Sequence, residues 1–179
     1  VINGKSQTGV TSFFLKHKID TGDILLSQTM EIGPEETTGN VHDRMMELGA
    51  EGVLKSVQRI ETGDYKLTPQ DASKVSKAPK LFKETCEIDF TKSARELKNF
   101  VRGLNPYPLA WTTLDGQEVK ILKADVTYDV HSHELGTVHT DYKSYLRYAI
   151  DVGYLEVLEL KPAGKRAMGV KDFLNGYKG

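Results

Sequence analysis

The sequence predicts two folded units: an α/β piece followed by a mostly β domain built as a small barrel of the OB type. Three observations lead to this fold class. Two apolar, β-branched segments precede a long helical period in residues 1–66. Residues 67–83 contain two prolines and have no apolar period, as is typical of a linker. Short strand patterns separated by glycine turns fill most of residues 84–179.

The pattern of the first unit predicts a strand, a turn, a second strand and a helix. β-branched and aromatic residues predict strands over residues 8–15 and 24–32, with a tight turn between them. Apolar residues then recur at helical spacing from Thr38 to Glu61, and Gly63 provides the stop. Two strands and one helix bury little apolar surface, so we expect this unit to be the end of a larger α/β domain.

The second unit opens with a predicted strand over residues 86–90 and a helix whose Ser93 and Glu96 have capping-box spacing. A proline after Asn105 ends that helix. Asp115-Gly116 is a strong hairpin signal between two apolar segments. The remaining predicted elements are strands over 109–114, 117–126, 137–139, 146–151 and 154–160, a turn at Val152-Gly153, and a short helix over 169–174.

Composition and charge exclude several classes of protein. No apolar run reaches the roughly 20 residues that a membrane helix needs, so we expect no membrane contact. The single cysteine, Cys86, cannot form an internal disulfide, which favours the cytoplasm. We expect the Cys86 thiol to be buried. The formal net charge of −1 leaves nucleic-acid binding to a local patch. The five histidines lack the spacing of a zinc set, His131-x-His133 included, so we expect no metal.

A local basic patch does exist, because residues 67–83 hold four lysines against one aspartate. These lysines have two readings, a solvated tether or a tether that also holds a phosphate backbone. OB-type barrels commonly bind oligonucleotides, so a basic face of the second unit would extend this surface. The residues that we expect to contact RNA are Lys80, Lys83, Arg102, Lys165 and Arg166.

The segment IDTGD carries the one candidate for proton chemistry. Asp20 and Asp23 lie three residues apart in the loop between the two predicted strands, and such a carboxylate can orient a histidine or accept a proton. An aspartate here can equally hydrogen-bond its own turn. His17 is open to the same two readings, an acid or phosphate contact on one side and a plain surface residue on the other.

Five segments, in order along nearly the whole chain, resemble the methionyl-tRNA formyltransferase family. TGVTSFFLKHKIDTGDIL (residues 8–25) resembles the stretch that closes the folate site of that family, and VHDRMMELGAEGVL (41–54) resembles the helix that follows. APKLFKETCEIDF (78–90) resembles the entry to its C-terminal domain. VRGLNPYPLAW (101–111) and KPAGKRAMGVKDFLNG (161–176) resemble later parts of that domain.

The resemblance implies a Rossmann-like formyltransferase domain in residues 1–66 and an OB-like, tRNA-binding domain in residues 84–179. It implies transfer of a formyl group from 10-formyltetrahydrofolate to the amino group of initiator methionyl-tRNA, and Asp20 matches the catalytic aspartate. His17, Lys18, Ile19 and Asp20 would border the folate. The lysines of the linker and the barrel would bind tRNA, and we expect a monomer without a metal.

This sequence departs from the family in one respect. The catalytic Asn and His of the family and its folate loop have no counterpart in the 179 residues. We therefore expect the chain to be a C-terminal portion of the enzyme that is inactive alone. Two alternatives stay open: a nucleotide-sugar N-formyltransferase, whose second domain is related, and a non-catalytic RNA-binding module with an OB-type barrel.

Overall fold

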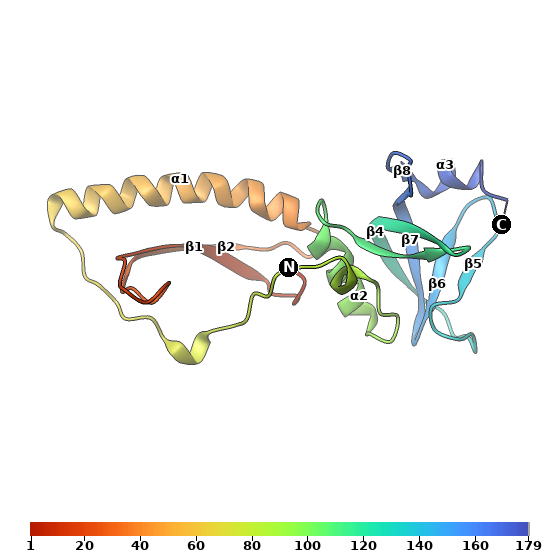
Figure 1. Cartoon of the computed structure of the whole chain (residues 1–179), viewed down its shortest axis with the longest axis horizontal. Coiled ribbons are helices and arrows are strands. Elements are labelled where there is room, and N and C mark those ends of the chain that lie inside the picture. Colours follow the sequence, from red (N-terminus) through yellow and green to blue (C-terminus); the bar gives the residue numbers. More distant parts are fainter. Residues whose placement is uncertain (179) are drawn as a thin grey trace. The chain divides into compact units, whose positions relative to one another are not determined.

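The structure, a computed structural model, describes residues 1–178 and divides into two compact units (Figure 1). The ribbon unit comprises residues 6–34 and 39–80. The sheet unit comprises residues 1–5, residues 35–38 and the chain from residue 81 onward. The predicted boundaries at 66/67 and 83/84 stay predictions. Each unit is described by itself.

The ribbon unit consists of two antiparallel strands and one long helix. Strands β1 (Gln7–Phe13) and β2 (Ile24–Glu31) and helix α1 (Thr38–Thr62) confirm the three predicted elements. Within this unit α1 approaches the ribbon closely, and a 2.7 Å hydrogen bond joins the hydroxyls of Ser12 and Ser56. A Cβ built at Gly52 would lie 2.7 Å from the side-chain oxygen of Gln28, so a small residue permits this approach.

The sheet unit is built on one curled antiparallel sheet in the order β3-β4-β7-β6-β5, with β8 paired to β7 (Figure 1). The curled sheet agrees with the predicted mostly β domain, and the assignment to an OB-type barrel stays a prediction. The strands are β3 (Ala110–Leu114), β4 (Gln117–Tyr128), β5 (Val138–Thr140), β6 (Leu146–Ile150), β7 (Gly153–Pro162) and β8 (Met168–Gly169).

The predicted hairpin turn is confirmed. Asp115 and Gly116 have φ values of 49° and 74°, the left-handed conformations that a type I′ turn needs at both central positions. This turn joins β3 to β4 and pairs Leu114 with Gln117. The next predicted turn lies one residue earlier than expected, because Gly153 already begins β7 and pairs with Tyr128.

Helix α2 (Ala94–Leu104) confirms the predicted capping box: the Ser93 hydroxyl accepts from the Glu96 N–H, and the Glu96 carboxylate accepts from the Ser93 N–H. The strand predicted over 86–90 is wrong. A short 3₁₀ turn, η2 (Glu84–Cys86), stands at its start, and only a single bridge joins Glu87 to Trp111. The Asp89 carboxylate accepts from the Thr91 N–H, and this local turn prevents further extension.

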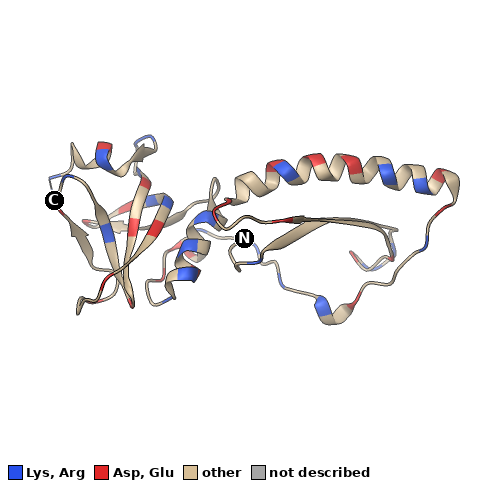
Figure 2. Cartoon of the chain, turned by 180° about the vertical axis from the view of Figure 1, so that it is seen from behind, with Lys and Arg blue, Asp and Glu red and all other residues tan. Residues whose placement is uncertain are grey.

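The hydrophobic core lies in the sheet unit, between the sheet, α2 and helix α3 (Val170–Leu174). Leu104, Ile121 and Leu155 are completely buried, and each such side chain stabilises the fold by roughly 1.5–3 kcal/mol. Cys86 is buried in the same cluster, as predicted from its lack of activating neighbours. Within residues 1–178 no helix is both long and apolar enough to cross a membrane, and α1 carries both signs of charge along its length (Figure 2).

Two short segments from earlier in the sequence complete the sheet unit. Arg102 of α2 donates to the carbonyl of Glu36 at 2.8 Å, and the Thr38 hydroxyl donates to the carbonyl of Gly103 at 2.7 Å. A Cβ built at Gly103 would lie 2.7 Å from the backbone nitrogen of Ile2, so the first residues pack directly on the helix backbone. The chain therefore contributes to this unit in three separate passes.

Candidate functional site

The loop between β1 and β2, residues 14–23, is held mainly through its backbone. The Phe14 N–H donates to the Asp23 carbonyl at 3.1 Å and closes the loop at its base. Gln70, from the segment predicted as a linker, donates its side-chain amide to the carbonyls of Asp20 (3.0 Å) and Gly22 (2.8 Å). A Cβ at Gly22 would lie 1.6 Å from the Phe14 carbonyl oxygen, so only glycine fits. Sequence reasoning missed Gln70, since nothing in its neighbourhood indicates a contact 50 residues away.

The Asp20 carboxylate is exposed and takes no part in holding this loop. The turn is formed instead by its neighbours: the Thr21 hydroxyl donates to the Lys18 carbonyl at 2.9 Å, and Asp23 pairs with Lys16 at 2.9 Å. Asp20 itself has a φ of 56°, and within residues 1–178 no hydrogen bond or ion pair reaches its side chain. The carboxylate thus remains available to orient an imidazole or to carry a proton.

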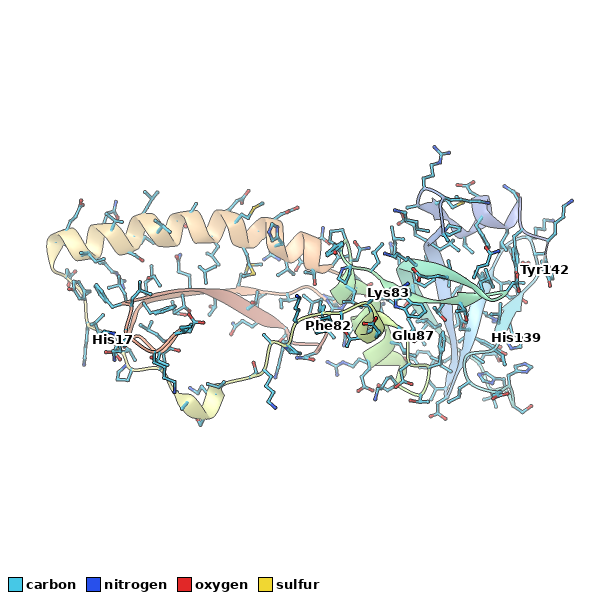
Figure 3. All side chains as sticks on the ribbon, viewed as in Figure 1. His17, Phe82, Lys83, Glu87, His139 and Tyr142 are labelled. Atoms are coloured by element: carbon cyan, nitrogen blue, oxygen red, sulfur yellow. The ribbon has the colours of Figure 1, made fainter. Side chains whose placement is uncertain are left out.

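A surface hollow of about 630 Å³ lies on the same loop, and Asp20 is not among the residues that line it. The loop brings His17 and Lys18 into its lining, and Figure 3 labels His17 in the ribbon unit. Ile19 lies outside the lining and is 84% exposed. The lining residues are Leu15, Lys16, His17, Lys18 and Thr21.

A second candidate surface lies at the start of the sheet unit. Lys83 makes a 2.6 Å ion pair with Glu118, and its ammonium lies 5.5 Å from the centroid of the Trp111 ring. The hydrogen bond to Glu118 and the charge of that carboxylate raise the pKa of Lys83 above its usual value. The lysine therefore carries a charge that Glu118 already partly neutralises, beside the half-buried Trp111; Figure 3 labels Lys83.

A ladder across three strands extends this surface. Trp111 of β3 pairs with Lys120 of β4, and Lys120 pairs with Lys161 of β7, so the three side chains share one face of the sheet. The Asp115-Gly116 turn signal in the sequence implies the first of these pairings, Trp111 with Lys120. A cavity of about 450 Å³ borders the ladder, lined by Leu81, Phe82, Lys83, Cys86, Tyr107, Pro108, Leu109, Trp111, Glu118 and Lys120.

The other predicted RNA contacts fall at separate places. Arg102 uses its guanidinium inside the sheet unit, on Asn99 (2.9 Å) and on the Glu36 carbonyl. Lys165 and Arg166 lie exposed in the turn that joins β7 to β8, while Lys80 belongs to the ribbon unit. Their contact with RNA stays a prediction.

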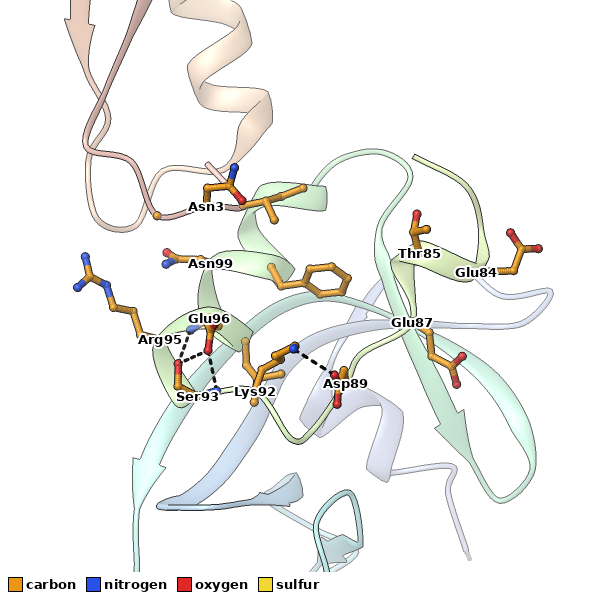
Figure 4. Close-up of a pocket in the computed structure, with 14 residues that line it drawn as sticks. Asn3, Glu84, Thr85, Glu87, Asp89, Lys92, Ser93, Arg95, Glu96 and Asn99 are labelled. Carbon is orange, nitrogen blue, oxygen red and sulfur yellow. Dashed lines mark hydrogen bonds and ion pairs between the residues drawn. The ribbon is translucent and has the colours of Figure 1, made fainter. Parts of the chain in front are cut away.

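A cavity of about 600 Å³ at the start of α2 carries mixed charge (Figure 4). Its carboxylates serve local structure: Asp89 accepts from Thr91 and faces Lys92 at 3.6 Å, and Glu96 completes the helix cap. These hydrogen bonds lower the pKa of both carboxyl groups. We assign this cavity no chemistry, because Asp89, Lys92 and Glu96 are engaged in local contacts. Among residues 1–178, no group of three histidines, cysteines or carboxylates is positioned to hold a metal ion.

Comparison with protein-family models decides the affiliation of the chain. Residues 1–57 match the model described as formyl transferase, and residues 80–178 match the model described as formyl transferase, C-terminal domain. The chain belongs to the formyl transferase family. The resemblance drawn from the five sequence segments is thereby confirmed.

Relatives of this formyl transferase chain match it almost from end to end. It is 43% identical over 188 residues to methionyl-tRNA formyltransferase of Phocaeicola vulgatus and 41% identical over 181 residues to that of Flavobacterium johnsoniae. The alignments cover 99% and 98% of the chain, which spans only 58% and 57% of the relatives' length.

Solved structures share its fold at low identity. HypX from Aquifex aeolicus in complex with tetrahydrofolic acid has a TM-score of 0.67 at 20% identity, covering 99% of this chain and 32% of that one. An N-formyltransferase from Helicobacter canadensis, in complex with folinic acid and dTDP-3-aminofucose, has a TM-score of 0.64 at 19% identity, covering 87% and 56%. At these identities the likeness concerns the fold alone.

Proposed function

We propose that this chain is part of a methionyl-tRNA formyltransferase that moves a formyl group from 10-formyltetrahydrofolate to the amino group of initiator methionyl-tRNA. The observation that carries the proposal is the identity of about 40%, over nearly the whole chain, to relatives named for that reaction. The protein would work in the cytoplasm, as its single cysteine favours, and as a monomer.

In this reaction the methionyl amine forms a bond to the formyl carbon, and the bond from that carbon to N10 of the folate breaks. The amine gives up one proton and N10 takes one, so a group that transfers protons accelerates both changes. Asp20 suits this role, because its carboxylate is exposed and unengaged on a loop whose backbone is fixed by Gln70 and Gly22. It would act through water or through an imidazole that it orients.

The backbone of residues 17–19 would border the pterin ring of the folate. The exposed loop backbone beside the hollow suits the donor and acceptor edge of a pterin, and the lining contains no carboxylate. This observation supports binding of the donor on the ribbon unit, with His17, Lys18, Ile19 and Asp20 as the nearest residues.

The sheet unit would bind the tRNA. Its curled sheet is consistent with an OB-type barrel, a fold that binds oligonucleotides by combining basic and aromatic side chains. The face formed by Trp111, Lys120 and Lys161, with Lys83 beside it, supports this assignment. Lys80, Lys165 and Arg166 would add phosphate contacts, whereas Arg102 would act mainly by holding Glu36.

The test offers two acceptors to one enzyme. The full-length product of the gene that encodes these residues is incubated with 10-formyltetrahydrofolate and either methionyl-tRNA or a UDP-linked amino sugar. Formylated product and released tetrahydrofolate are both measured. We expect transfer to methionyl-tRNA only.

Two outcomes would contradict the proposal. Transfer to the sugar alone would make the protein a nucleotide-sugar N-formyltransferase. Binding of tRNA with no transfer to either acceptor would make it an RNA-binding module. A catalytically inactive preparation is distinguished from the second outcome by first measuring tetrahydrofolate binding, which a module without the enzymatic function would lack.

A further inference from the structure

The sheet unit carries a cluster of cationic and aromatic side chains that the proposed function leaves unused. His131 and His133 lie in the β4–β5 loop, His139 on β5, Arg147 on β6 and Tyr154 on β7. Their rings are in mutual contact: the centroids of His133 and His139 are 4.0 Å apart, and those of His139 and Tyr154 are 5.3 Å apart. We call these five residues the His–Arg cluster; Figure 3 labels His139 within it.

Aromatic rings hold Arg147 in place by stacking on the flat faces of its guanidinium group. The group stacks on Tyr154, with 3.8 Å from Cζ to the ring centroid, and on Tyr145 at 4.7 Å. Stacking of this kind leaves the N–H donors unused. Within residues 1–178 no carboxylate pairs with Arg147, and its Nε is buried without a hydrogen-bond partner. A planar fork of donors is thus held in place with nothing to bind.

The histidines beside it are engaged in local hydrogen bonds. The Nδ1 atom of His131 accepts from the His133 N–H at 3.1 Å, so its Nε2 carries the proton and donates to the Gly153 carbonyl at 2.7 Å. His139 is next to Arg147 in register and contacts the Thr137 hydroxyl at 3.2 Å. Burial, followed by the charges of His133, Arg147 and His131, lowers the pKa of His139 below its usual value.

The same geometry argues against a metal ion at the His–Arg cluster. Both ring nitrogens of His131 are already engaged, and the rings of His131 and His133 stack at 5.3 Å with only 26° between their planes. Nitrogen lone pairs of stacked rings do not converge on one point, as metal coordination requires. An anion, by contrast, is attracted by the Arg147 guanidinium and its N–H donors.

The acidic groups near the cluster do not neutralise it. Glu156 of β7 lies opposite Arg147 in register and so shares its face of the sheet, but no ion pair joins the two among the described residues. Asp125 of β4, next in that row, is bound to Lys98 at 3.0 Å. Glu134 of the β4–β5 loop contributes a backbone carbonyl, which accepts from the Thr137 hydroxyl. The neighbouring groups Tyr154 of β7 and Tyr145, which directly precedes β6, are phenols that stack on Arg147.

We propose that Arg147, His133 and His139 form a phosphate-binding site in which the His139 imidazole takes up a proton as the anion binds. The guanidinium fork matches two oxygens of a phosphate group, and bidentate pairing of this type is the strongest that arginine makes. The negative charge of the ligand offsets the burial and the neighbouring charges that lower the pKa of His139, so a protonated His139 becomes a further donor. Binding is therefore expected to strengthen as the pH falls.

Sulfate is the appropriate first probe, because it keeps its double charge across the pH range in which phosphate itself titrates. The chain of 179 residues is titrated with sulfate at about pH 6 and about pH 8 while the imidazole nitrogen signals are followed by NMR. We expect the His139 and His133 signals to shift, and the affinity to be about tenfold higher at the lower pH, the change for a one-unit shift in a single pKa. Inorganic phosphate at one pH, about 7, is expected to move the same signals.

Three variants make the test specific. Arg147→Gln removes the fork and is expected to abolish the shifts. Arg147→Lys keeps the charge but loses the planar donors, so affinity is expected to fall about tenfold. His139→Gln is expected to keep binding at about pH 8 and to reduce its pH dependence. Lys171→Gln, which removes a positive charge from α3 in the same unit, is the matched control and is expected to change nothing.

The result that overturns the proposal is a sulfate response that is absent, independent of pH, or unchanged in Arg147→Gln while circular dichroism reports a folded sheet unit. The source of the phosphate is then resolved with tRNA. Displacement of sulfate from the same signals by tRNA supports the site with an RNA phosphodiester as ligand. Displacement by inorganic phosphate and not by tRNA supports it with a free phosphate as ligand.

Discussion

The two units position their candidate functional groups by different physical means. The sheet unit buries a continuous apolar cluster, and its lysines, tryptophan and His–Arg cluster lie on strands fixed by that packing. The ribbon unit buries Leu25, Ile32 and Val41, and leaves several large apolar side chains of α1 exposed. Its loop is fixed by backbone hydrogen bonds and by the close approach at Gly22. Packing therefore governs the geometry of one unit, and a few polar contacts govern that of the other.

The largest expected effect is a loss of folding stability when a buried side chain of the sheet unit is truncated, compared with an exposed one of the ribbon unit. Leu155→Ala, at a completely buried position of β7, is expected to destabilise the chain by about 2–5 kcal/mol, because it removes buried methyl groups and leaves a cavity. Leu54→Ala, at a position of α1 that is 66% exposed, serves as the matched control and should cost under about 0.5 kcal/mol. Denaturant unfolding of the chain measures both. Equal losses would show that the exposed face of α1 is packed in solution.

Replacing Asp20 is expected to change the reaction rate without changing the stability of the fold. Asp20→Asn in the full-length gene product is expected to lower kcat at least about 100-fold, the scale of acid–base catalysis. The unfolding midpoint should stay unchanged, since no contact within residues 1–178 depends on that carboxylate. Asp23→Asn is the control: it breaks the ion pair with Lys16 and should affect the rate far less. A loss under about threefold for Asp20→Asn would contradict a catalytic role for this carboxylate.

A variant of Gln70 tests whether its two hydrogen bonds hold the loop between β1 and β2. Gln70→Ala removes both hydrogen bonds to the loop carbonyls, and we expect kcat/KM to fall about tenfold while stability falls by about 1 kcal/mol or less. Asp71→Ala changes the next residue, whose side chain contacts Ser73 and Lys74 and not the loop, and should leave kcat/KM unchanged. Equal effects of the two variants would mean that the segment, rather than the Gln70 amide, supports the loop.

The smallest expected effect concerns single phosphate contacts. Lys80→Ala in the ribbon unit and Lys120→Ala or Lys161→Ala in the sheet unit should each reduce the slope of log affinity for tRNA against log salt by up to about 0.9. Lys83→Ala should reduce it less, because the charge of Lys83 is already paired with Glu118. Lys55→Ala, which breaks only a pair with Glu51 on α1, is the control. A slope unchanged by every one of these variants would contradict the proposed tRNA surface.

Local signals predicted most of the fold. The Asp115-Gly116 turn and the Ser93–Glu96 capping box are formed by residues close in sequence, and both occur as expected. The failure at residues 86–90 has a local cause as well, since the Asp89 side chain competes with the strand for backbone hydrogen bonds.

The candidate sites depend on contacts that the sequence does not encode locally. The hydrogen bonds of Gln70 and the pairing of Lys120 with Lys161 each join distant segments, and the approach of His139 to Arg147 depends on the register of two strands. Periodicity indicates the face of a strand, but it does not identify the neighbouring strand. The resemblance indicates Asp20, because an aspartate in a turn also has an ordinary structural role. In the structure the side-chain contacts of this turn come from Thr21 and Asp23.

The three passes of the chain through the sheet unit have a consequence for limited proteolysis. A protease that cuts in the exposed segment after helix η1 (Ala72–Lys74) breaks the covalent link by which the chain passes from the ribbon unit into residue 81 of the sheet unit. The two fragments should nevertheless remain associated, because residues 35–38 stay bound to α2 through Glu36, Thr38 and the ion pair of Glu35 with Lys98. The nicked protein should therefore elute as one species under native conditions and separate into two only when it is denatured.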